Sequence, residues 1–419
     1  MSPARKTDRS SPGHPPPAAP GAPVSCRPRP GPRDERGPGP RQAPVSAPAL
    51  VDADVAAAVD GVLESVLRDR VAQATRLDPV FGAGVAERLA RFALCGGKRL
   101  RARFLWWGMR ACAGSGGAPE DDGRTAAALR LAAALELIQV CALVQDDVMD
   151  GSPVRRGRPA LHTELAARCP ERPPAGLAFG AAAAVLAGDL ALVWADDLAA
   201  CPGPSPAADE AVRALWRALR TEMIAGQYLD LRGQSTAGRS PDEAVRTACL
   251  KSARYTVERP LGLGAALAGA DPVVTGALCA AGRLAGTAFQ LRDDLRNAFG
   301  GPGTSGKPAG DDLRNGKPTY LLAVACARAQ AQGRRADLAL LRRRPGPGGF
   351  PDAEVARLRA VLDETGARRA VEQKIEQLVA DGERQLAAAR AEPAAGRQLR
   401  ALMRSSAGLP ADGGEGSAR

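Results

Sequence analysis

Residues 143–158, LVQDDVMDGSPVRRGR, close a long apolar pattern of helical period with three aspartates. On a helix, Asp146 and Asp150 are one turn apart and Asp147 is three residues from Asp150, so the three carboxylates can converge on one region. Without a ligand this placement is unfavourable, because each like-charged pair costs about 0.2–0.5 kcal/mol and the helix dipole adds about 0.3–1 kcal/mol against anions at a C-terminus. A multivalent cation reverses the sign, and oxygen ligands with room for water suit Mg²⁺.

A second acidic cluster has nearly the same spacing. FQLRDDLRN, at residues 289–297, ends another apolar pattern just before the Gly/Pro-rich stretch 300–310 and carries Asp293 and Asp294, with Asn297 at the third position. One such cluster alone could be a solvated acidic helix end. Two clusters at two helix ends predict facing carboxylate walls.

Basic groups accompany both clusters. GGKRLR, at residues 96–101, opens a predicted helix, where free backbone N–H groups and the dipole favour phosphate and Arg101 offers a guanidinium suited to bidentate contact. Further cations stand at Lys98, Arg155, Arg156, Lys251, Lys307 and Lys317. Each of these alone could be a solvated basic patch. Together with the carboxylates and an apolar helical interior, they predict an apolar substrate that carries a diphosphate.

From about residue 50 onward the sequence predicts an all-α fold. Ala, Leu, Arg and Glu dominate, apolar residues recur at i, i+3, i+4 and i+7, and no run alternates as a strand would. The predicted helices span residues 51–76, 84–94, 99–113, 123–150, 177–200, 207–232, 241–269, 273–299, 317–331, 352–390 with a break, and 397–407. We expect one domain over residues 49–408, preceded by a disordered Pro/Arg-rich tail over 1–48 and followed by a flexible C-terminus over 409–419.

Composition argues against several other classes of protein. The chain has 419 residues, 45% of them apolar and 3% aromatic, and a net charge of +11. The basic tail lacks aromatic residues for base stacking, which argues against a nucleic-acid partner. The longest strongly apolar stretch, Leu177 to Gly188, is shorter than the roughly 18 residues of a membrane span, and the N-terminus lacks the apolar run of a secretory signal. We therefore expect no membrane span and a cytoplasmic location.

Histidine and cysteine usage narrows the chemistry further. His14 and His162 are the only histidines, so a His-based triad is disfavoured and His162 is expected to be structural. The nine cysteines form no CxxC pair and are expected to be reduced core residues. Residues 301–307 read GxxxxGK as in a P-loop. However, Pro308 stands where Ser or Thr must bind magnesium, and a predicted helix precedes the motif instead of a strand, so nucleotide binding is not expected here.

Taken in order, GGKRLR, DDVMD, RRG, GQYLDL (Gly226 to Leu231), FQLRDD and the GK-GDD-GK pattern resemble the trans-prenyl diphosphate synthases. This is the polyprenyl synthetase family of isoprenoid metabolism. The resemblance covers about residues 50–405 and is greatest to the bacterial geranylgeranyl diphosphate synthases. It implies an all-α bundle around a deep central cavity, the isoprenoid synthase fold, and a homodimer. It also implies the magnesium-dependent head-to-tail condensation of isopentenyl diphosphate with an allylic diphosphate.

The resemblance also implies a role for each motif residue. Two magnesium ions would be held by Asp146, Asp147 and Asp150, and a third by Asp293 and Asp294. The allylic diphosphate would contact Arg155, Lys251, Ser252, Gln290, Lys307 and Lys317, with Lys251 also counted as catalytic. Isopentenyl diphosphate would contact Lys98, Arg101, Gln139 and Arg156. The sequence departs from the commonest family pattern at Asn297, Ser252, Gln139 and Gln145, and the loss of a carboxylate at Asn297 puts the affinity for the third ion in question.

Several alternatives stay open at this stage. A farnesyl or longer-chain diphosphate synthase, a terpene cyclase on the same fold, a non-catalytic partner subunit and a binding module for anionic lipid or nucleic acid would share parts of this pattern. The residues four and five positions before Asp146 are Ala142 and Cys141, about one turn deeper along the helix. Bulky aromatics at these positions in the resembling family close the cavity floor at fifteen carbons. These small residues therefore favour geranylgeranyl diphosphate as the product, although both could instead be ordinary packing residues.

Overall fold

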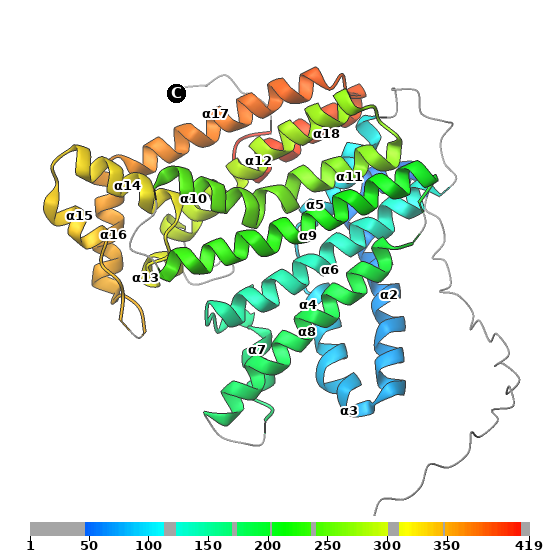
Figure 1. The fold of residues 1–419 in the computed structure, drawn as a ribbon, viewed down its shortest axis with the longest axis horizontal. Helices are drawn as coiled ribbons and strands as arrows, with labels where there is room; N and C mark the ends of the chain where they lie inside the picture. Colours follow the sequence, from blue (N-terminus) through cyan, green and yellow to red (C-terminus); the bar gives the residue numbers. More distant parts are fainter. Residues whose placement is uncertain are drawn as a thin grey trace, which may run out of the picture. The chain divides into compact units, whose positions relative to one another are not determined.

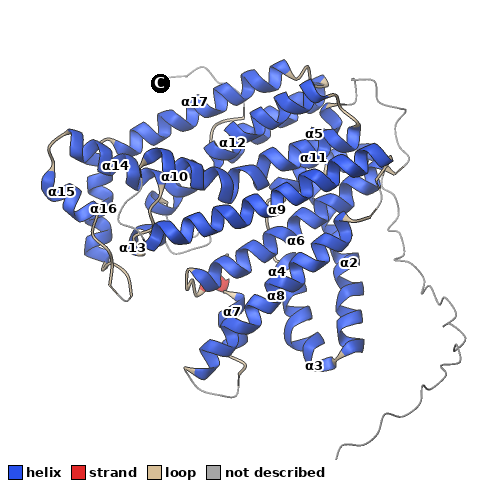
Figure 2. Ribbon diagram, viewed as in Figure 1, coloured by secondary structure: helices blue, strands red, loops and turns tan. Residues whose placement is uncertain are grey.

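The structure is a computed structural model that describes residues 47–112, 123–169, 174–201, 203–235, 240–300, 310–346 and 348–411. Lys307 lies outside these ranges, as do nearly all of the expected tail and the end of the expected C-terminal segment. The described helices belong to one compact unit, residues 43–419. As Figure 2 shows, this unit is built of helices with one short hairpin.

Figure 1 labels α2 to α18 and colours the chain in sequence order. The bounds of the helices and strands are α1 Pro48–Ala53, α2 Val55–Leu77, α3 Pro79–Phe81, the π-helix η1 Gly82–Ala86, α4 Glu87–Leu94, α5 Leu100–Ala111, α6 Arg124–Met149, β1 Val154–Arg155, β2 Arg158–Pro159, α7 Leu161–Ala166, α8 Ala175–Ala199, α9 Pro206–Ser235, α10 Pro241–Ala248, the π-helix η2 Cys249–Glu258, α11 Arg259–Ala268, α12 Pro272–Phe299, α13 Asp311–Arg314, α14 Tyr320–Ala331, α15 Arg335–Leu341, α16 Asp352–Glu364, α17 Ala367–Ala388 and α18 Pro393–Ser406.

Local capping explains where many of these helices begin. Asp271 caps α12, its side chain accepting hydrogen bonds from the backbone N–H groups of Val273 and Val274, and Pro272 fills the first helical position. Ser240 and Glu243 form a reciprocal capping box at the start of α10. These signals make the helix starts near residues 241 and 272 readable from sequence.

Helix α6 lies at the centre of the main core and is buried along most of its length. It packs against α8, α5 and α2, while α11 packs against α5 and α9, and α12 packs against η2 and α17. A second hydrophobic cluster joins the C-terminal half of α12 to α13 through α17. The carboxylate-bearing ends of α6 and α12 are thereby fixed by two packed cores.

Close helix contacts depend on residues without side chains. A Cβ on Gly108 of α5 would lie 3.1 Å from the Cα of Leu261 in α11, and a Cβ on Gly264 would lie 2.6 Å from the backbone nitrogen of Met109. Glycine at both positions lets the two backbones approach directly. At these two positions glycine therefore serves close helix packing.

The predicted all-α fold is confirmed, with local differences. The predicted helix 241–269 is a continuous helical run whose middle is the π-helix η2, and the helix predicted from 317 begins at Tyr320. The sequence patterns also missed α3, α7, α13, α15 and the hairpin β1–β2. In the hairpin, Arg156 and Gly157 both have positive φ, the backbone of a tight two-residue turn, and one residue of this pair is an arginine, which is an uncommon choice there.

Three helices among the described residues, α6, α8 and α12, are long and apolar enough to cross a membrane by length and composition alone. The apolar window of α6 is 78% buried inside the protein, whereas those of α8 and α12 are 39% buried. The apolar character of α6 is thus accounted for by the core, and that of α8 leaves an exposed apolar face.

Candidate active site

A cavity of about 440 Å³ opens among α5, α6, α9, α10, η2, α12 and the segment that follows α13. Both predicted carboxylate clusters reach it, through Asp146 on one side and Asp293 and Asp294 on the other. Its apolar lining includes Ala142, Leu143 and Phe289. The cavity therefore joins two acidic walls to an apolar interior.

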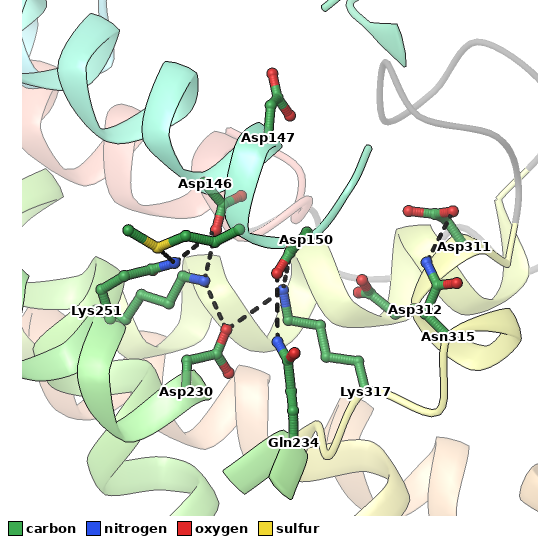
Figure 3. Close-up of polar contacts among 12 residues, drawn as sticks. Asp146, Asp147, Asp150, Asp230, Gln234, Lys251, Asp311, Asp312, Asn315 and Lys317 are labelled. Atoms are coloured by element: carbon green, nitrogen blue, oxygen red, sulfur yellow. Dashed lines mark hydrogen bonds and ion pairs between the residues drawn. The ribbon is translucent and has the colours of Figure 1, made fainter. Parts of the chain in front are cut away.

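In the first cluster, Asp146 and Asp150 turn toward α9 and the segment after α13 (Figure 3). Asp146 accepts hydrogen bonds from Gln227 Nε2 at 3.1 Å and from Lys251 Nζ at 2.9 Å. Asp150 accepts one from Lys317 Nζ at 3.0 Å. Each carboxylate thus has a cationic partner from another part of the chain.

Asp147 points away from Asp146 and Asp150 (Figure 3) and is only 1% exposed. Arg155 Nε donates to both of its carboxylate oxygens, at 2.9 and 3.1 Å. The expected convergence of three carboxylates therefore holds for two of them, because successive residues on a helix point about 100° apart. Asp147 fixes Arg155, whose guanidinium also reaches Asp146 at 3.4 Å.

The centre of the polar network is Asp230 on α9. It accepts a hydrogen bond from Lys251 Nζ at 2.6 Å and forms an ion pair with Lys317 Nζ at 3.4 Å. Burial opposes the ionisation of Asp230, but the charges of Lys317 and Lys251 outweigh it and lower the pKa of this carboxyl. Burial likewise opposes the charged form of Lys317, yet Asp230, Asp312 and Asp150 outweigh it and hold the pKa of Lys317 well above its usual range. Lys317 is therefore held in its charged form.

The second cluster has a different electrostatic balance. Burial, reinforced by the charge of Asp312, raises the pKa of Asp294 well above its usual range, although Gln290 Nε2 donates to it at 2.9 Å. Asn297 does not extend the acidic row: its side-chain oxygen accepts a hydrogen bond from the backbone N–H of Asp312 at 3.0 Å. This wall holds carboxylates that gain from an added cation.

Arg101 lies at the cavity wall formed by α5 and is 9% exposed. Its guanidinium stacks on the ring of Tyr255 at 4.3 Å and donates to the Thr256 hydroxyl at 2.9 Å. Gln139, on α6, also lines the cavity and accepts a hydrogen bond from the Tyr255 hydroxyl at 2.8 Å. Among the described residues the buried Nε of Arg101 has no hydrogen-bond partner.

The turn that precedes α5 is held from outside the cavity. Gly96 and Gly97 have φ of 75° and 134°, and Arg156 donates to the carbonyl oxygens of Cys95 and Gly96 at 2.9 and 2.7 Å. Lys98 and Arg156 are exposed, and neither is among the described residues that line the cavity. Arg156 thus orients this turn, and Lys98 lies on its outer face.

Of the remaining residues discussed from the sequence, some line the cavity and others lie outside its lining. Ser252, Gln290 and Ala142 line the cavity. Cys141 is 1% exposed and is not among the described lining residues; burial, together with Asp189, raises the pKa of its thiol to about 12. His162 is also outside the described lining, and burial lowers its pKa.

The donor chemistry of the two walls fits magnesium. The acidic ligands are oxygen-only, and Asp294 is crowded by Asp312 in a way that a cation relieves. Within the described ranges, no group of three or more acidic, Cys or His side chains is arranged to hold a metal ion unaided. Mg²⁺ usually takes one or two carboxylates from a protein and its other ligands from phosphate and water, and each wall offers carboxylates of this kind.

Several site residues were not singled out from the sequence. Asp230 and Gln227 belong to the GQYLDL motif, which predicts no separate role for either residue, and Asp312 belongs to the GDD motif. Tyr255 and Thr256 carry no motif. Their proximity to Arg101 and Gln139 arises from the packing of η2 against its neighbours and has no signal in the sequence.

An all-α bundle with two carboxylate-bearing helix ends at one cationic cavity defines an isoprenoid synthase fold. Residues 85–347 match the family model described as polyprenyl synthetase. The chain belongs to the polyprenyl synthetase family.

Its relatives make prenyl diphosphates of different length. The chain is 36% identical over 239 residues to (2E,6E)-farnesyl diphosphate synthase of Mycobacterium tuberculosis, covering 57% of this chain and 61% of that protein. It is 31% identical over 291 residues to a geranylgeranyl diphosphate synthase of the same species, covering 68% and 74%. The aligned part thus spans about three fifths of the farnesyl relative.

The solved structures of similar proteins agree with the fold. The geranylgeranyl pyrophosphate synthase of Corynebacterium glutamicum, solved with isoprenyl diphosphate and magnesium, matches with a TM-score of 0.76 and 38% identity over 83% of this chain and 97% of that one. A polyprenyl synthase of Caulobacter crescentus, solved with calcium and isoprenyl diphosphate, matches with a TM-score of 0.65 and 27% identity over 86% and 95%.

The opposite pKa directions of Asp294 and Asp230 predict opposite effects of neutralising them in the metal-free protein. Asp294→Asn should raise the free energy of unfolding near pH 7, because the native state resists the charge that the unfolded chain accepts. This gain should shrink as the pH falls toward about 4, where the unfolded-state carboxyl becomes protonated. Asp230→Asn should lower the free energy of unfolding by about 1–3 kcal/mol, because Lys251 and Lys317 lose a shared buried partner while each keeps one carboxylate, Asp146 or Asp150.

Denaturant unfolding in a chelator, from pH 2 to 8, measures both effects, because the native pKa of Asp230 lies below the ordinary aspartate value. The Asp230 contribution should be complete above its unfolded-state pKa and be lost as the pH falls through its lower native pKa. Two variants that shift stability in the same direction near pH 7 would contradict this electrostatic account.

Proposed function

We propose that the protein catalyses the magnesium-dependent head-to-tail condensation of isopentenyl diphosphate with an allylic diphosphate. The observation that carries the proposal is the meeting of both acidic walls with Lys251, Lys317 and Arg101 at one partly apolar cavity. An acidic, cation-rich end suits a diphosphate, and an apolar end suits a hydrocarbon chain. The names of the relatives and the ligands of the solved structures support the same chemistry.

The chain's own residues would divide the work between two ends of the cavity. Asp146 and Asp150, with Asp293 and Asp294, would hold magnesium, which supplies positive charge to the departing diphosphate. Lys251 and Lys317 lie beside the first acidic wall, where they can stabilise the same developing charge. Arg101 and Gln139 would hold isopentenyl diphosphate, and the apolar lining would exclude water from the allylic cation.

The allylic diphosphate would be contacted by Ser252, Gln290 and Arg155. Asp147 would hold Arg155 in place for that contact. Lys98, in the turn before α5, and Arg156, in the hairpin turn that donates to it, would act on the isopentenyl diphosphate side. Lys307 keeps its proposed diphosphate contact although it lies outside the described residues. The family resemblance implies about three magnesium ions.

Loss of a metal ligand should abolish turnover without unfolding the protein. Asp146→Ala and Asp293→Ala should each reduce turnover by about 10³-fold or more, since each removes a ligand at the developing negative charge. Purified protein is incubated with magnesium, isopentenyl diphosphate and dimethylallyl, geranyl or farnesyl diphosphate, and the products are sized. Asp363→Ala, on the exposed surface of α16, is the control.

Three outcomes of that assay would contradict the proposal. Wild-type turnover in both variants would remove the site assignment. A terpene cyclase would consume a long allylic diphosphate without isopentenyl diphosphate. Absence of turnover in the unchanged protein with every primer would favour a non-catalytic subunit.

We propose geranylgeranyl diphosphate as the main product, since Ala142 lines the cavity with a small side chain next to the first acidic wall. Ala142→Phe should shift the product from twenty carbons to fifteen without abolishing turnover, whereas Ala142→Ser should leave it unchanged. Cys141→Phe should shorten the product as well, and because Cys141 is buried it should also destabilise the fold by about 1–3 kcal/mol. An unchanged product distribution in both Phe variants would overturn this length assignment.

We also propose a cytoplasmic homodimer formed through α8. Phe179, Leu186 and Val193, seven residues apart, are 52%, 62% and 55% exposed and form one apolar stripe. A stripe of this kind on a soluble helical protein marks a protein interface, and a second copy would cover it with an identical stripe.

Charges on the stripe should split the dimer. Phe179→Glu combined with Leu186→Glu should sediment as a monomer at concentrations where the unchanged protein is dimeric. Val273→Glu, at an exposed position of α12, is the control. A monomeric unchanged protein would contradict the dimer.

A further inference from the structure

The π-helix η2 runs for ten residues between α10 and α11. Such helices are rare, usually last a single turn and occur at functional sites. Four residues of η2 line the cavity in two rows: Lys251 and Tyr255, and Ser252 and Thr256. One irregular helix therefore supplies a whole wall of the candidate active site.

The two ends of η2 serve different parts of the cavity. At its N-terminal end, Lys251 Nζ donates to Asp146 at 2.9 Å and to Asp230 at 2.6 Å. About one turn later, the Tyr255 hydroxyl donates to Gln139 at 2.8 Å, and the Tyr255 ring lies under the Arg101 guanidinium. The acidic wall and the Arg101 wall are thus tied to the same short helix.

The position of Arg101 depends on this helix. Its guanidinium is held by the Thr256 hydroxyl, which is fully buried, and by the face of Tyr255. No ion pair joins Arg101 to a carboxylate anywhere in the described ranges, and its buried Nε has no hydrogen-bond partner there. Two neutral contacts orient the guanidinium and leave its charge uncompensated, which is the arrangement an anionic ligand requires.

The backbone of η2 is fixed from both sides by glycines. A Cβ on Gly226 of α9 would overlap the backbone of Lys251, and a Cβ on Gly286 of α12 would lie 2.8 Å from the Cα of Ala253. At the end of η2, the buried Glu258 accepts two hydrogen bonds from Arg283 at 2.9 and 3.0 Å. These contacts set where Lys251 and Tyr255 stand relative to one another.

We propose that Thr256 and Tyr255 are positioning residues for Arg101 and Gln139, and that η2 holds the isopentenyl diphosphate subsite in register with the allylic subsite. This inference rests on the proposed function. It adds that the two subsites are placed by one helix whose backbone is fixed by the glycines of α9 and α12.

The decisive test compares two substitutions at Thr256. Thr256→Val keeps the shape but removes the hydroxyl that Arg101 donates to, and should raise the KM for isopentenyl diphosphate about tenfold, with the allylic KM changed by less than about twofold. Thr256→Ser keeps the hydroxyl and should leave the KM for isopentenyl diphosphate at the wild-type value. Tyr255→Phe keeps the ring under Arg101 but frees Gln139, and should raise the same KM by a smaller factor.

A second pair tests the register of the whole helix. Gly286→Ala should displace η2 and raise both KM values. Gly276→Ala lies on the same helix α12, where an added Cβ meets nothing within 4 Å, and should leave both unchanged. Thermal unfolding of every variant separates loss of fold from loss of register.

The outcomes separate this inference from the function on which it rests. Turnover in the unchanged protein, with equal KM changes for both substrates in Thr256→Val or with a defect that Thr256→Ser shares, would overturn the positioning role and leave the proposed function standing. No turnover in the unchanged protein would overturn both.

Discussion

The site depends on the neutralisation of carboxylates that the fold brings together at the edge of an apolar cavity. Asp230 is the central group, since it pairs with Lys251 and Lys317, and these lysines in turn reach Asp146 and Asp150. Without cationic partners, buried carboxylates would each destabilise the fold by roughly several kcal/mol. The lysines make the first acidic wall compatible with a folded protein, and they remain beside it as cations when a diphosphate arrives.

This network can form because the helix backbones approach closely. Gly226 lets α9 touch the backbone of η2 beside Lys251, so that Asp230, one turn further along α9, meets the Lys251 ammonium. The same device joins α5 to α11 at Gly108 and Gly264 and thereby places Arg101 against η2. The close helix packing and the pairing of charges at the site therefore both depend on these glycines.

The sequence could predict the helices, the two acidic helix ends and most of the cations, because capping, periodicity and like-charge spacing are local properties. It could not predict that Asp147 turns to Arg155 instead of joining Asp146, since that choice depends on the hairpin β1–β2, whose strands are only two residues long. It also could not predict η2. Residues 249–258 have an ordinary helical composition, and the π geometry comes with close contacts to α9 and α12.

Asn297 illustrates how a departure from a motif can have a structural reason. A third carboxylate at this position would add negative charge beside Asp294, which burial and Asp312 already make hard to ionise. The Asn297 amide oxygen instead accepts the backbone N–H of Asp312, and its backbone carbonyl accepts that of Gly310 at 2.7 Å. Asn297 therefore anchors the turn that brings Asp312 to the cavity. The acidic wall keeps a third carboxylate nearby, supplied by the following segment of the chain rather than by the helix.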